Sequence, residues 1–249
     1  MNKEYIEKYL KETQEIAQII NNEDIDKFIK ILFDAWKNNN KIITVGNGGS
    51  SSTASHFTGD LLKTVANTSS MKEISKVKGF KSICLNDNVA SLTAWTNDSG
   101  WDNAYTGLLN TLLDKDDVVL LISVHGGSGW SGNIVQAMQL AKERGAKILG
   151  LSGFNGGKLK EMADACIVVP KDSTPHVEGF HGVLQHLIIF RLVDLINDYS
   201  KKDVINKIKS LADESEDPII KIQLNDILKN EGKNIEESEL KNIAIKSKG

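Results

Sequence analysis

Two kinds of hydrophobic spacing alternate along the chain. Apolar residues recur every three or four positions through residues 3–39, and two asparagines, Asn21 and Asn22, interrupt the series. This spacing predicts a pair of antiparallel helices at the N-terminus. The period then changes, because residues 41–45 are a short β-branched run that ends in glycines. We therefore expect a strand here, followed by a loop and a further helix.

Four more short apolar runs follow, and each is separated from the next by a loop and a helical stretch. They occupy residues 80–84, 117–123, 147–151 and 165–169. The helical patterns cover residues 88–110, interrupted at 97–100, then 133–144 and 159–163. Strands that alternate with helices pair in parallel, with right-handed crossovers. The sequence predicts an α/β fold with a doubly wound, five-stranded parallel sheet flanked by helices.

The end of the chain has a different character. Residues 177–198 are apolar almost all round, which predicts a helix buried against the sheet or a partner subunit. From Lys201 onward the chain is rich in lysine and glutamate, with few apolar positions. We expect one domain over residues 1–198, including the N-terminal helical pair, and a charged helical extension over 199–249.

Composition narrows the classes of partner. A net charge of -3 over 249 residues gives no general attraction to nucleic acid or to an anionic membrane. Arg144 and Arg191 are the only arginines, so backbone amides and hydroxyls are better candidates for holding a phosphate. Cys84 and Cys166 lie in strand-like runs without a Cys-x-x-Cys partner, and we expect both to be reduced and buried. We find neither a signal peptide nor a membrane span, and expect a cytoplasmic protein.

Two glycine- and hydroxyl-rich loops follow predicted strands. The first, residues 46–53, reads Gly-Asn-Gly-Gly-Ser-Ser-Ser-Thr, and the second covers residues 123–133. Parallel strands bring such loops to one crevice, where free amides and a helix N-terminus favour an anion. Neither loop has the full dinucleotide or P-loop fingerprint. A compact phosphate ester therefore fits better than a dinucleotide.

All five histidines lie in or beside the loops and helix starts just described. They are His56, His125, His176, His181 and His186. Imidazole binds divalent metals and moves protons near neutral pH. His56 and Asp60 are spaced i, i+4 on the helix after the first loop, so both side chains point the same way. One metal ion, or one substrate hydroxyl, could meet both.

Five motifs in order resemble the sugar isomerase (SIS) family, closest to its phosphoheptose isomerase branch, over about residues 1–198. They are Val-Gly-Asn-Gly-Gly-Ser at 45–50, His-Phe-Thr-Gly-Asp at 56–60, Asn-Asp-Ser-Gly at 97–100, the loop from Ser123, and residues 174–186. The resemblance implies the SIS fold and a zinc-dependent isomerase that interconverts sedoheptulose 7-phosphate and a heptose 7-phosphate through an enediol. It further implies a cytoplasmic homotetramer with sites near subunit interfaces, serving lipopolysaccharide or capsule biosynthesis.

The resemblance also implies roles for individual residues. The metal ligands would be His56, Asp60, Glu178 and His186, with His186 as the acid and Asp60, a glutamate in the family, as base and ligand. Two positions depart from the family, because Asp60 is one methylene shorter and Glu178 replaces a glutamine. We hypothesise from these departures that Asp60 is drawn toward the metal and that Glu178 is the base. Separate Asp60→Asn and Glu178→Gln variants test it.

Ten residues are candidates for binding the substrate: Asn47, Gly48, Gly49, Ser50, Asn97, Asp98, Ser123, His125, Ser128 and His176. His125 stands where the family has a hydroxyl, and His176 replaces a basic residue and could touch a phosphate. The loop after Ser123 is also about three residues longer and contains Trp130. We therefore expect an altered pocket, suited to a different sugar.

Helical geometry constrains this set. Glu178 and His186 are eight residues apart, which on one helix means about 12 Å along the axis and about 80° around it. Either the helix begins after Glu178, or one of the two residues completes the site of a neighbouring subunit. His181 shares a helical face with neither His176 nor His186, so its role stays open.

Two further functions fit the same sequence. One is a non-catalytic SIS protein that senses a phosphosugar or bridges a partner. The other is an isomerase for a different sugar phosphate, favoured by Asp60, Glu178, His125 and the long loop. Retention of His56, an acid at position 60 and His186 favours an enzyme over a sensor.

Overall fold

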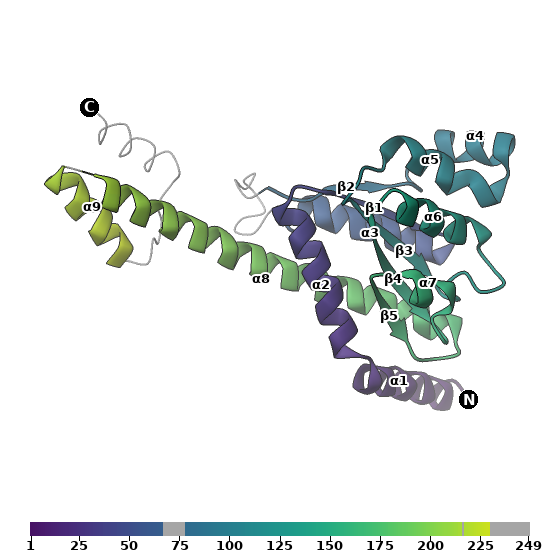
Figure 1. Cartoon of the computed structure of the whole chain (residues 1–249). Coiled ribbons are helices and arrows are strands. Elements are labelled where there is room, and N and C mark those ends of the chain that lie inside the picture. Colours follow the sequence, from purple (N-terminus) through teal and green to yellow (C-terminus); the bar gives the residue numbers. More distant parts are fainter. Residues whose placement is uncertain (67–77, 216, 230–249) are drawn as a thin grey trace. The chain divides into compact units, whose positions relative to one another are not determined.

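The computed structural model describes residues 1–66, 78–215 and 217–229. In the first of its two units, Met1–Val193, five parallel strands form one sheet in the order β2-β1-β3-β4-β5 (Figure 1). Their bounds are β1 Lys41–Gly46, β2 Lys81–Cys84, β3 Val118–Ser123, β4 Lys147–Gly153 and β5 Ala165–Val169. The predicted doubly wound parallel sheet is therefore confirmed.

The position of each strand follows from its sequence. All six residues of β3 are buried, as expected for a central strand that is covered on both faces. β1 pairs with β2 on one side and β3 on the other, so Thr44 lies between Cys84 and Leu120. The C-terminal ends of β1, β3 and β4 consequently lie along one edge of the sheet, which positions the site.

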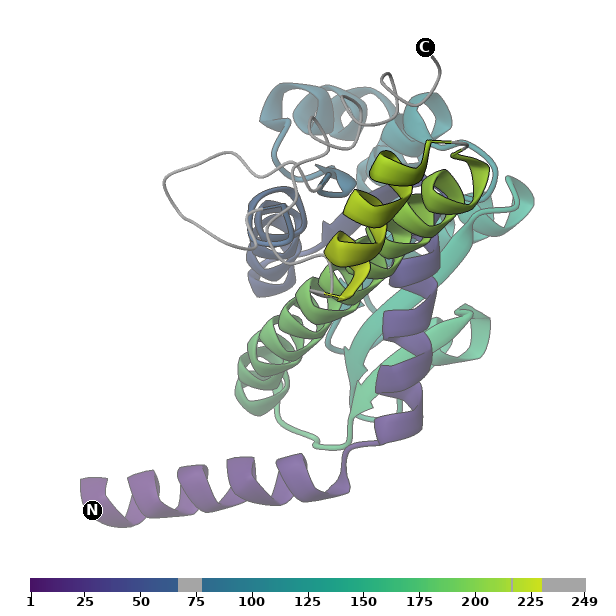
Figure 2. The same ribbon diagram turned by 90° about the vertical axis from the view of Figure 1, so that its left-hand side faces the viewer.

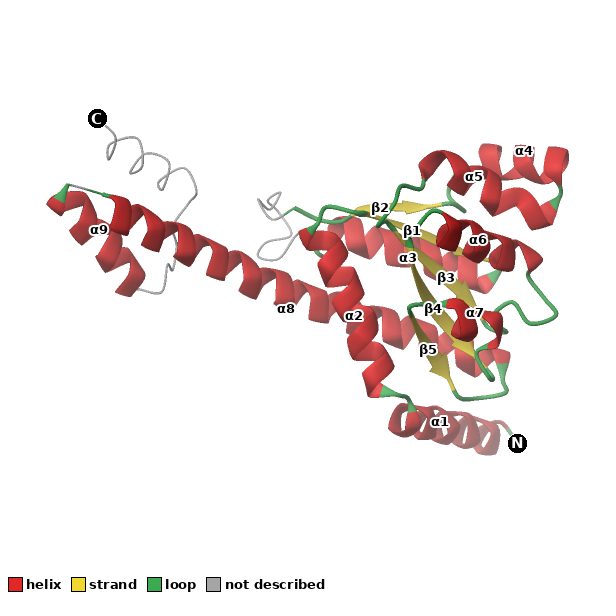
Figure 3. Cartoon of the chain, viewed as in Figure 1, coloured by secondary structure: helices red, strands yellow, loops and turns green. Residues whose placement is uncertain are grey.

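Helices cover both faces of the sheet (Figure 3). One core cluster joins Val45 and Leu121 of the strands to Tyr105, Ile134 and other buried residues of the helices on one face. On the other face, α3 packs against β1 and β2, and α2 against β5. The bounds are α2 Asn22–Lys37, α3 Gly49–Lys63, α4 Val89–Ser99, the 3-10 helix η1 Trp101–Asn103, α5 Ala104–Leu112, α6 Gly132–Glu143 and α7 Gly157–Met162.

The N-terminal helices differ from the predicted antiparallel pair. The break at Asn21 is correct, and its side chain caps α2 by accepting hydrogen bonds from the amides of Glu23 and Asp24. However, α1, Asn2–Ile19, projects away from α2 instead of folding back on it (Figures 1 and 2). Only Ile16 of α1 is buried. Among the described residues, the apolar stripe that predicted a paired helix is therefore left largely exposed and is not covered by α2.

The last helices lead into the second unit, Asp194–Gly249. α8, Thr174–Glu214, begins in the first unit and ends in the second, where α9, Pro218–Lys229, follows. In the second unit, Ile208 and Ala212 of α8 pack with Ile220 and Leu224 of α9. The expected extension is thus helical over residues 199–214 and 218–229, and residues 216 and 230–249 lie outside the described residues.

One described helix meets a length-and-composition test for a membrane span. This helix is α8, and 44% of its most apolar stretch is buried inside the protein. The core helix of a water-soluble protein passes the same test, so one such helix is weak evidence for a span.

Candidate functional site

The loop between β1 and α3 is built on glycine. Gly48 has φ 56°, a left-handed conformation that glycine adopts without strain. A Cβ on Gly46 would lie 2.5 Å from the backbone oxygen of Ser50, so only glycine fits that close approach. The turn ends at Gly49, the first residue of α3. The positive end of the α3 dipole therefore lies at the edge of the sheet.

A pair of amide side chains, of which Asn133 is buried, ties this loop to the start of α6. Asn47 and Asn133 donate to each other, at 2.9 and 3.0 Å between the amide nitrogens and oxygens. The Tyr105 hydroxyl lies 2.7 Å from the carbonyl of Gly46 and 2.9 Å from Oδ1 of Asn47. Burial raises the pKa of Tyr105 to about 12, so the phenol stays protonated. The loops after β1 and β3 are thus held at fixed separation.

A pocket of about 190 Å³ opens where these two loops meet the beginning of α8. Hydroxyl and amide side chains dominate its lining, which comprises Asn47, Ser50, Ile122, Ser123, Val124, His125, Ser131, Thr174 and Glu178. The two loops converge, as their places after parallel strands predicted. Ser131 and Thr174 were not foreseen as lining residues, although a hydroxyl residue at the start of a helix was available as a signal.

Glu178 brings a carboxylate into this pocket. A Cβ on Gly49 would lie 2.7 Å from its Oε1, so the carboxylate lies against the first residue of α3. The helix N-terminus favours a negative charge there. No hydrogen bond or ion pair joins Glu178 to another residue within the ranges that the structure describes. Its charge is therefore available to repel or attract whatever enters the pocket.

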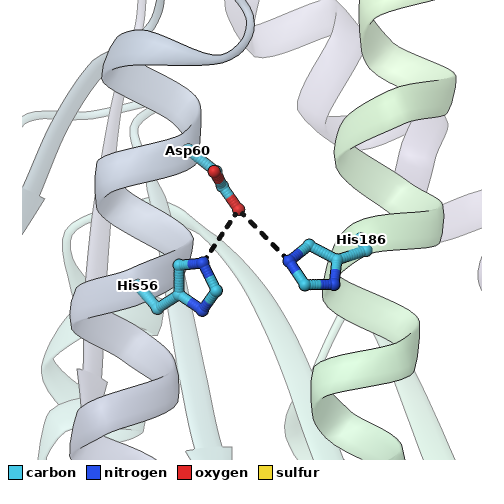
Figure 4. Close-up of side chains that lie close together, drawn as sticks. All are labelled: His56, Asp60 and His186. Atoms are coloured by element: carbon cyan, nitrogen blue, oxygen red, sulfur yellow. Dashed lines mark ion pairs between the residues drawn. The ribbon is translucent and has the colours of Figure 1, made fainter.

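A second group of side chains lies farther along the same two helices (Figure 4). Oδ2 of Asp60 is 3.5 Å from Nε2 of His56 on α3 and 4.0 Å from Nε2 of His186 on α8. The two imidazole rings meet edge to face, with centroids 5.3 Å apart. The histidine side chains are 57% and 56% exposed, whereas Asp60 is only 17% exposed. The group is open to solvent on its histidine side.

The Asp60 carboxylate is held by hydrogen bonds to both of its oxygens. Thr64 Oγ1 donates to Oδ1 at 2.8 Å, and Gln185 Nε2 donates to Oδ2 at 2.9 Å. Gln185 is fully buried. Neither donor was predicted from the sequence. The available signal was a lone amide within the apolar run of α8, between Leu184 and Leu187.

The donor atoms of this group fit a divalent metal ion. One ligand atom from each of His56, Asp60 and His186 lies within 4.8 Å of the other two. Two imidazole nitrogens and one carboxylate oxygen form a donor set typical of catalytic zinc, which keeps a fourth position open. Among the described residues, only this group of acids, cysteines and histidines has that arrangement.

Glu178, one of the four ligands predicted from the family resemblance, does not join this group. α8 begins at Thr174, so Glu178 and His186 share one continuous helix. They are therefore separated by about 12 Å along its axis. The alternative that the helix begins after Glu178 is wrong. Within one chain, the expected four-ligand site is divided into a three-residue cluster and a carboxylate in the neighbouring pocket.

His176, a predicted substrate contact, lies away from the pocket. Its ring stacks on Tyr9 of α1, with centroids 4.0 Å apart, and its Nε2 is 3.5 Å from Glu12 Oε2. Residues that are two positions apart on a helix point in directions about 200° apart, so the His176 side chain faces away from that of Glu178. This histidine anchors α1 and does not line the pocket.

Five other predicted contacts also lie outside the pocket lining. Two of them, Gly48 and Gly49, form the turn into α3. Asn97 and Asp98 are exposed at the end of α4, where the amide of one donates to the carboxylate of the other. Ser128 is exposed and its hydroxyl lies toward Gly157. From the same loop, Ser131 lines the pocket instead.

His125 does line the pocket, and aromatic rings hold it there. Its ring centroid is 4.4 Å from that of Phe154 and 6.0 Å from that of Trp130. Trp130 is 69% exposed. Trp130 of the long loop thus packs beside a histidine of the pocket lining, although neither Trp130 nor Phe154 is itself a lining residue.

His181 is a buried structural residue. Its Nε2 lies 3.1 Å from the carbonyl oxygen of Ser152, which can only accept, so that nitrogen carries the proton. Burial lowers the pKa of His181 to about 4, and the ring is neutral at pH 7. His181, whose role the sequence left open, therefore anchors α8 to β4.

Sequence comparison finds relatives across most of the chain. The SIS domain pattern matches residues 4–153. A phosphoheptose isomerase from Aliarcobacter butzleri is 34% identical over 190 residues, which cover 76% of this chain and 95% of that protein. The lincomycin biosynthesis protein LmbN from Streptomyces lincolnensis is 36% identical over 166 residues, 64% of this chain and 58% of its own length.

Solved structures show the same likeness. The phosphoheptose isomerase GmhA from Neisseria gonorrhoeae matches 80% of this chain and 100% of its own, with a TM-score of 0.65 and 26% identity. A phosphoheptose isomerase from Francisella tularensis matches 78% of this chain and 96% of its own, with a TM-score of 0.66 and 28% identity.

Proposed function

The chain belongs to the SIS domain family and is a sugar-phosphate isomerase, and we propose that it uses one divalent metal, zinc, to interconvert an aldose and a ketose phosphate. The simplest substrate is sedoheptulose 7-phosphate, converted to D-glycero-D-manno-heptose 7-phosphate. The observation that supports this is the cluster of His56, Asp60 and His186. A cluster of this kind supplies a base, an acid and metal ligands within reach of one substrate.

The reaction moves one proton between adjacent carbons. A base removes the proton from the carbon next to the carbonyl, and the carbonyl oxygen takes up a proton, which gives an enediol. The base then returns its proton to the former carbonyl carbon, while the neighbouring hydroxyl loses one. When bound, the metal would steady the negative charge that develops on oxygen. His56, Asp60 and His186 would hold it.

We assign the base to Asp60 and the oxygen-side proton transfers to His186. The two side chains face each other at 4.0 Å, so they can serve two neighbouring substrate atoms. Glu178 lies about 12 Å along α8 from His186, too far to share such a pair within one chain. This assignment replaces the hypothesis, drawn from the sequence, that Glu178 is the base.

The pocket at the start of α3 and α8 is the proposed phosphate site. Ser50, Ser123, Ser131 and Thr174 offer hydroxyl donors there, and the α3 N-terminus offers a positive dipole end. His125 adds a group that can carry positive charge. Glu178 opposes a phosphate dianion, and Trp130 of the long loop packs beside His125. This pocket favours a sugar phosphate different from the heptose ester as the second candidate substrate.

We also propose that the protein is a cytoplasmic homo-oligomer, a tetramer, with its sites near subunit interfaces. Three large apolar residues on the first part of α8, Val183, Leu187 and Phe190, are between 47% and 59% exposed, around the turn that carries His186. On α1, Tyr5, Ile6 and Leu10 are similarly exposed. A second copy that covers these faces would bury apolar area and exclude water from the cluster.

One experiment tests the proposed function. The purified protein is analysed for bound zinc and assayed with sedoheptulose 7-phosphate and with shorter ketose phosphates, before and after treatment with a chelator. We expect bound zinc, turnover of at least one substrate, loss of turnover on chelation and recovery with added Zn²⁺. A protein without metal and without turnover would instead fit a phosphosugar sensor.

A further inference from the structure

The carboxylate of Asp60 is fixed from two helices at once. Thr64, on the turn after α3, donates to Oδ1, while Gln185 of α8 donates to Oδ2. A carboxylate rotates readily about its last torsion when its oxygens are unbound. Here each carboxylate oxygen accepts one hydrogen bond, at 2.8 Å for Oδ1 and 2.9 Å for Oδ2, and the two bonds together set the plane of the group. Oδ2 therefore has a defined direction relative to the two imidazoles.

Gln185 and His186 approach Oδ2 from different sides. Neighbouring residues on a helix differ by about 100° in direction. Gln185 is fully buried and reaches Asp60 from the interior, whereas the His186 side chain is 56% exposed and reaches it from the open side. One turn of α8 thus carries both Gln185, which donates to Asp60, and His186, whose imidazole lies beside it.

A primary amide suits this task chemically. It is a neutral donor, so it orients a carboxylate without cancelling its charge. An ionised oxygen accepts more than one hydrogen bond, and Oδ2 keeps capacity toward His56 and His186 after bonding Gln185. A lysine at the same place would compete with a metal cation, and a glutamate would repel Asp60.

Packing alone does not account for Gln185. Its Oε1 is buried without a hydrogen-bond partner among the residues that the structure describes. Such an orphaned acceptor costs stability, which an apolar side chain of similar size would avoid. The hydrogen bond to Asp60 is the one contact of this side chain that needs an amide.

We propose that Gln185 is a positioning residue, which holds Oδ2 of Asp60 toward the space between His56 and His186. Through this bond, α8 compensates for the short reach of an aspartate on α3. The inference rests on the proposed function, since it assigns Gln185 a role in the same metal-binding and proton-transfer site.

The test uses Gln185→Met in the full-length protein. Methionine keeps the size and the helix propensity of glutamine but removes the donor. The readouts are kcat and KM, the affinity for Co²⁺ from its visible absorption, and the thermal midpoint of unfolding. We expect kcat and Co²⁺ affinity to fall about 10–100-fold, with KM and the thermal midpoint little changed. Gln136→Met, on the exposed face of α6, is the matched control and should alter none of these.

A double-mutant cycle separates positioning from a merely structural role. In an Asp60→Asn background, Gln185→Met should lower Co²⁺ affinity by less than about threefold, because the group that it orients is already lost. A structural role would lower the affinity equally in both backgrounds. If the methionine variant folds poorly, Gln185→Asn keeps the amide but shortens its reach to Asp60, and the same loss of Co²⁺ affinity is expected.

The outcomes for Gln185 and for the proposed function can be told apart. Unchanged kcat and Co²⁺ affinity in a folded Gln185→Met or Gln185→Asn variant, beside an active wild type, overturns the positioning role alone. A wild type that neither binds Co²⁺ nor turns over any sugar phosphate overturns the proposed function, and the positioning role with it.

Discussion

Two carboxylates on the paired helices α3 and α8 lie in contrasting surroundings. Asp60 receives two hydrogen bonds and faces two imidazoles. Glu178 lines a pocket of hydroxyls beside a helix N-terminus and is bonded to no other described residue. In the cluster with His56 and His186, the carboxylate is placed for proton transfer and metal binding. In the pocket, the carboxylate is placed to act on the charge of the ligand that enters. Environment decides the role of each carboxylate.

The largest effect should come from the cluster. Replacing His186 with glutamine removes the proposed oxygen-side acid and one metal ligand while keeping a polar side chain. We expect kcat to fall by about 10²–10⁴, together with zinc content, measured by steady-state kinetics and elemental analysis. His125→Gln, in the pocket, is the matched control and should raise KM more than it lowers kcat. Equal losses of kcat in both variants would contradict the assignment of proton transfer to the cluster and of substrate binding to the pocket.

His181 anchors α8 between the two regions, and its effect should appear in stability. The folded pKa is about 4 and the ordinary value is 6.5. Between these values the unfolded chain binds more protons than the folded one, so stability falls as the pH drops from about 6.5 toward 4, by at most about 3 kcal/mol.

Chemical denaturation of the wild type and of His181→Gln at several pH values checks this expectation. Glutamine can still donate to the carbonyl of Ser152, but it does not titrate. The variant should lose part of the pH dependence in that window. An identical pH dependence in both proteins would show that His181 is not the titrating group.

The smallest effect should come from Glu178. Glu178→Gln removes a negative charge from the proposed phosphate pocket, and we expect KM to fall by a factor of about two to ten, more at low salt than at high salt. The matched control is Glu161→Gln on α7, whose carboxylate pairs with Lys158 at the surface. A KM that rises in the Glu178 variant would mean that this carboxylate binds the substrate directly.

The sequence predicted the sheet well because each strand is a short β-branched or apolar run between turn residues. It failed for α1, whose apolar stripe reads the same whether its partner is α2 or another molecule. The spacing of His56 and Asp60 predicted a shared direction, because four residues make about one helical turn. Gln185 could not be predicted in the same way, since its bond to Asp60 depends on how α8 packs on α3.

The resemblance to the SIS family had similar reach and limits. Motif order placed His56, Asp60 and His186 in one site, and the structure brings these three together. It also suggested His176 as a phosphate contact, but a helix turns that side chain toward Tyr9. α8 begins at Thr174, so His176 and Glu178 both lie within the helix. Two positions along a helix correspond to a turn of about 200°, and the two side chains therefore point to opposite faces.

Proton exchange at carbon distinguishes Asp60 from Glu178 as the base. Each variant is incubated with the sugar phosphate in D₂O, and NMR follows deuterium at the carbon that loses its proton. We predict that Glu178→Gln incorporates deuterium at nearly the wild-type rate, while Asp60→Asn incorporates almost none. Continued exchange by Asp60→Asn, with none by Glu178→Gln, would contradict the assignment.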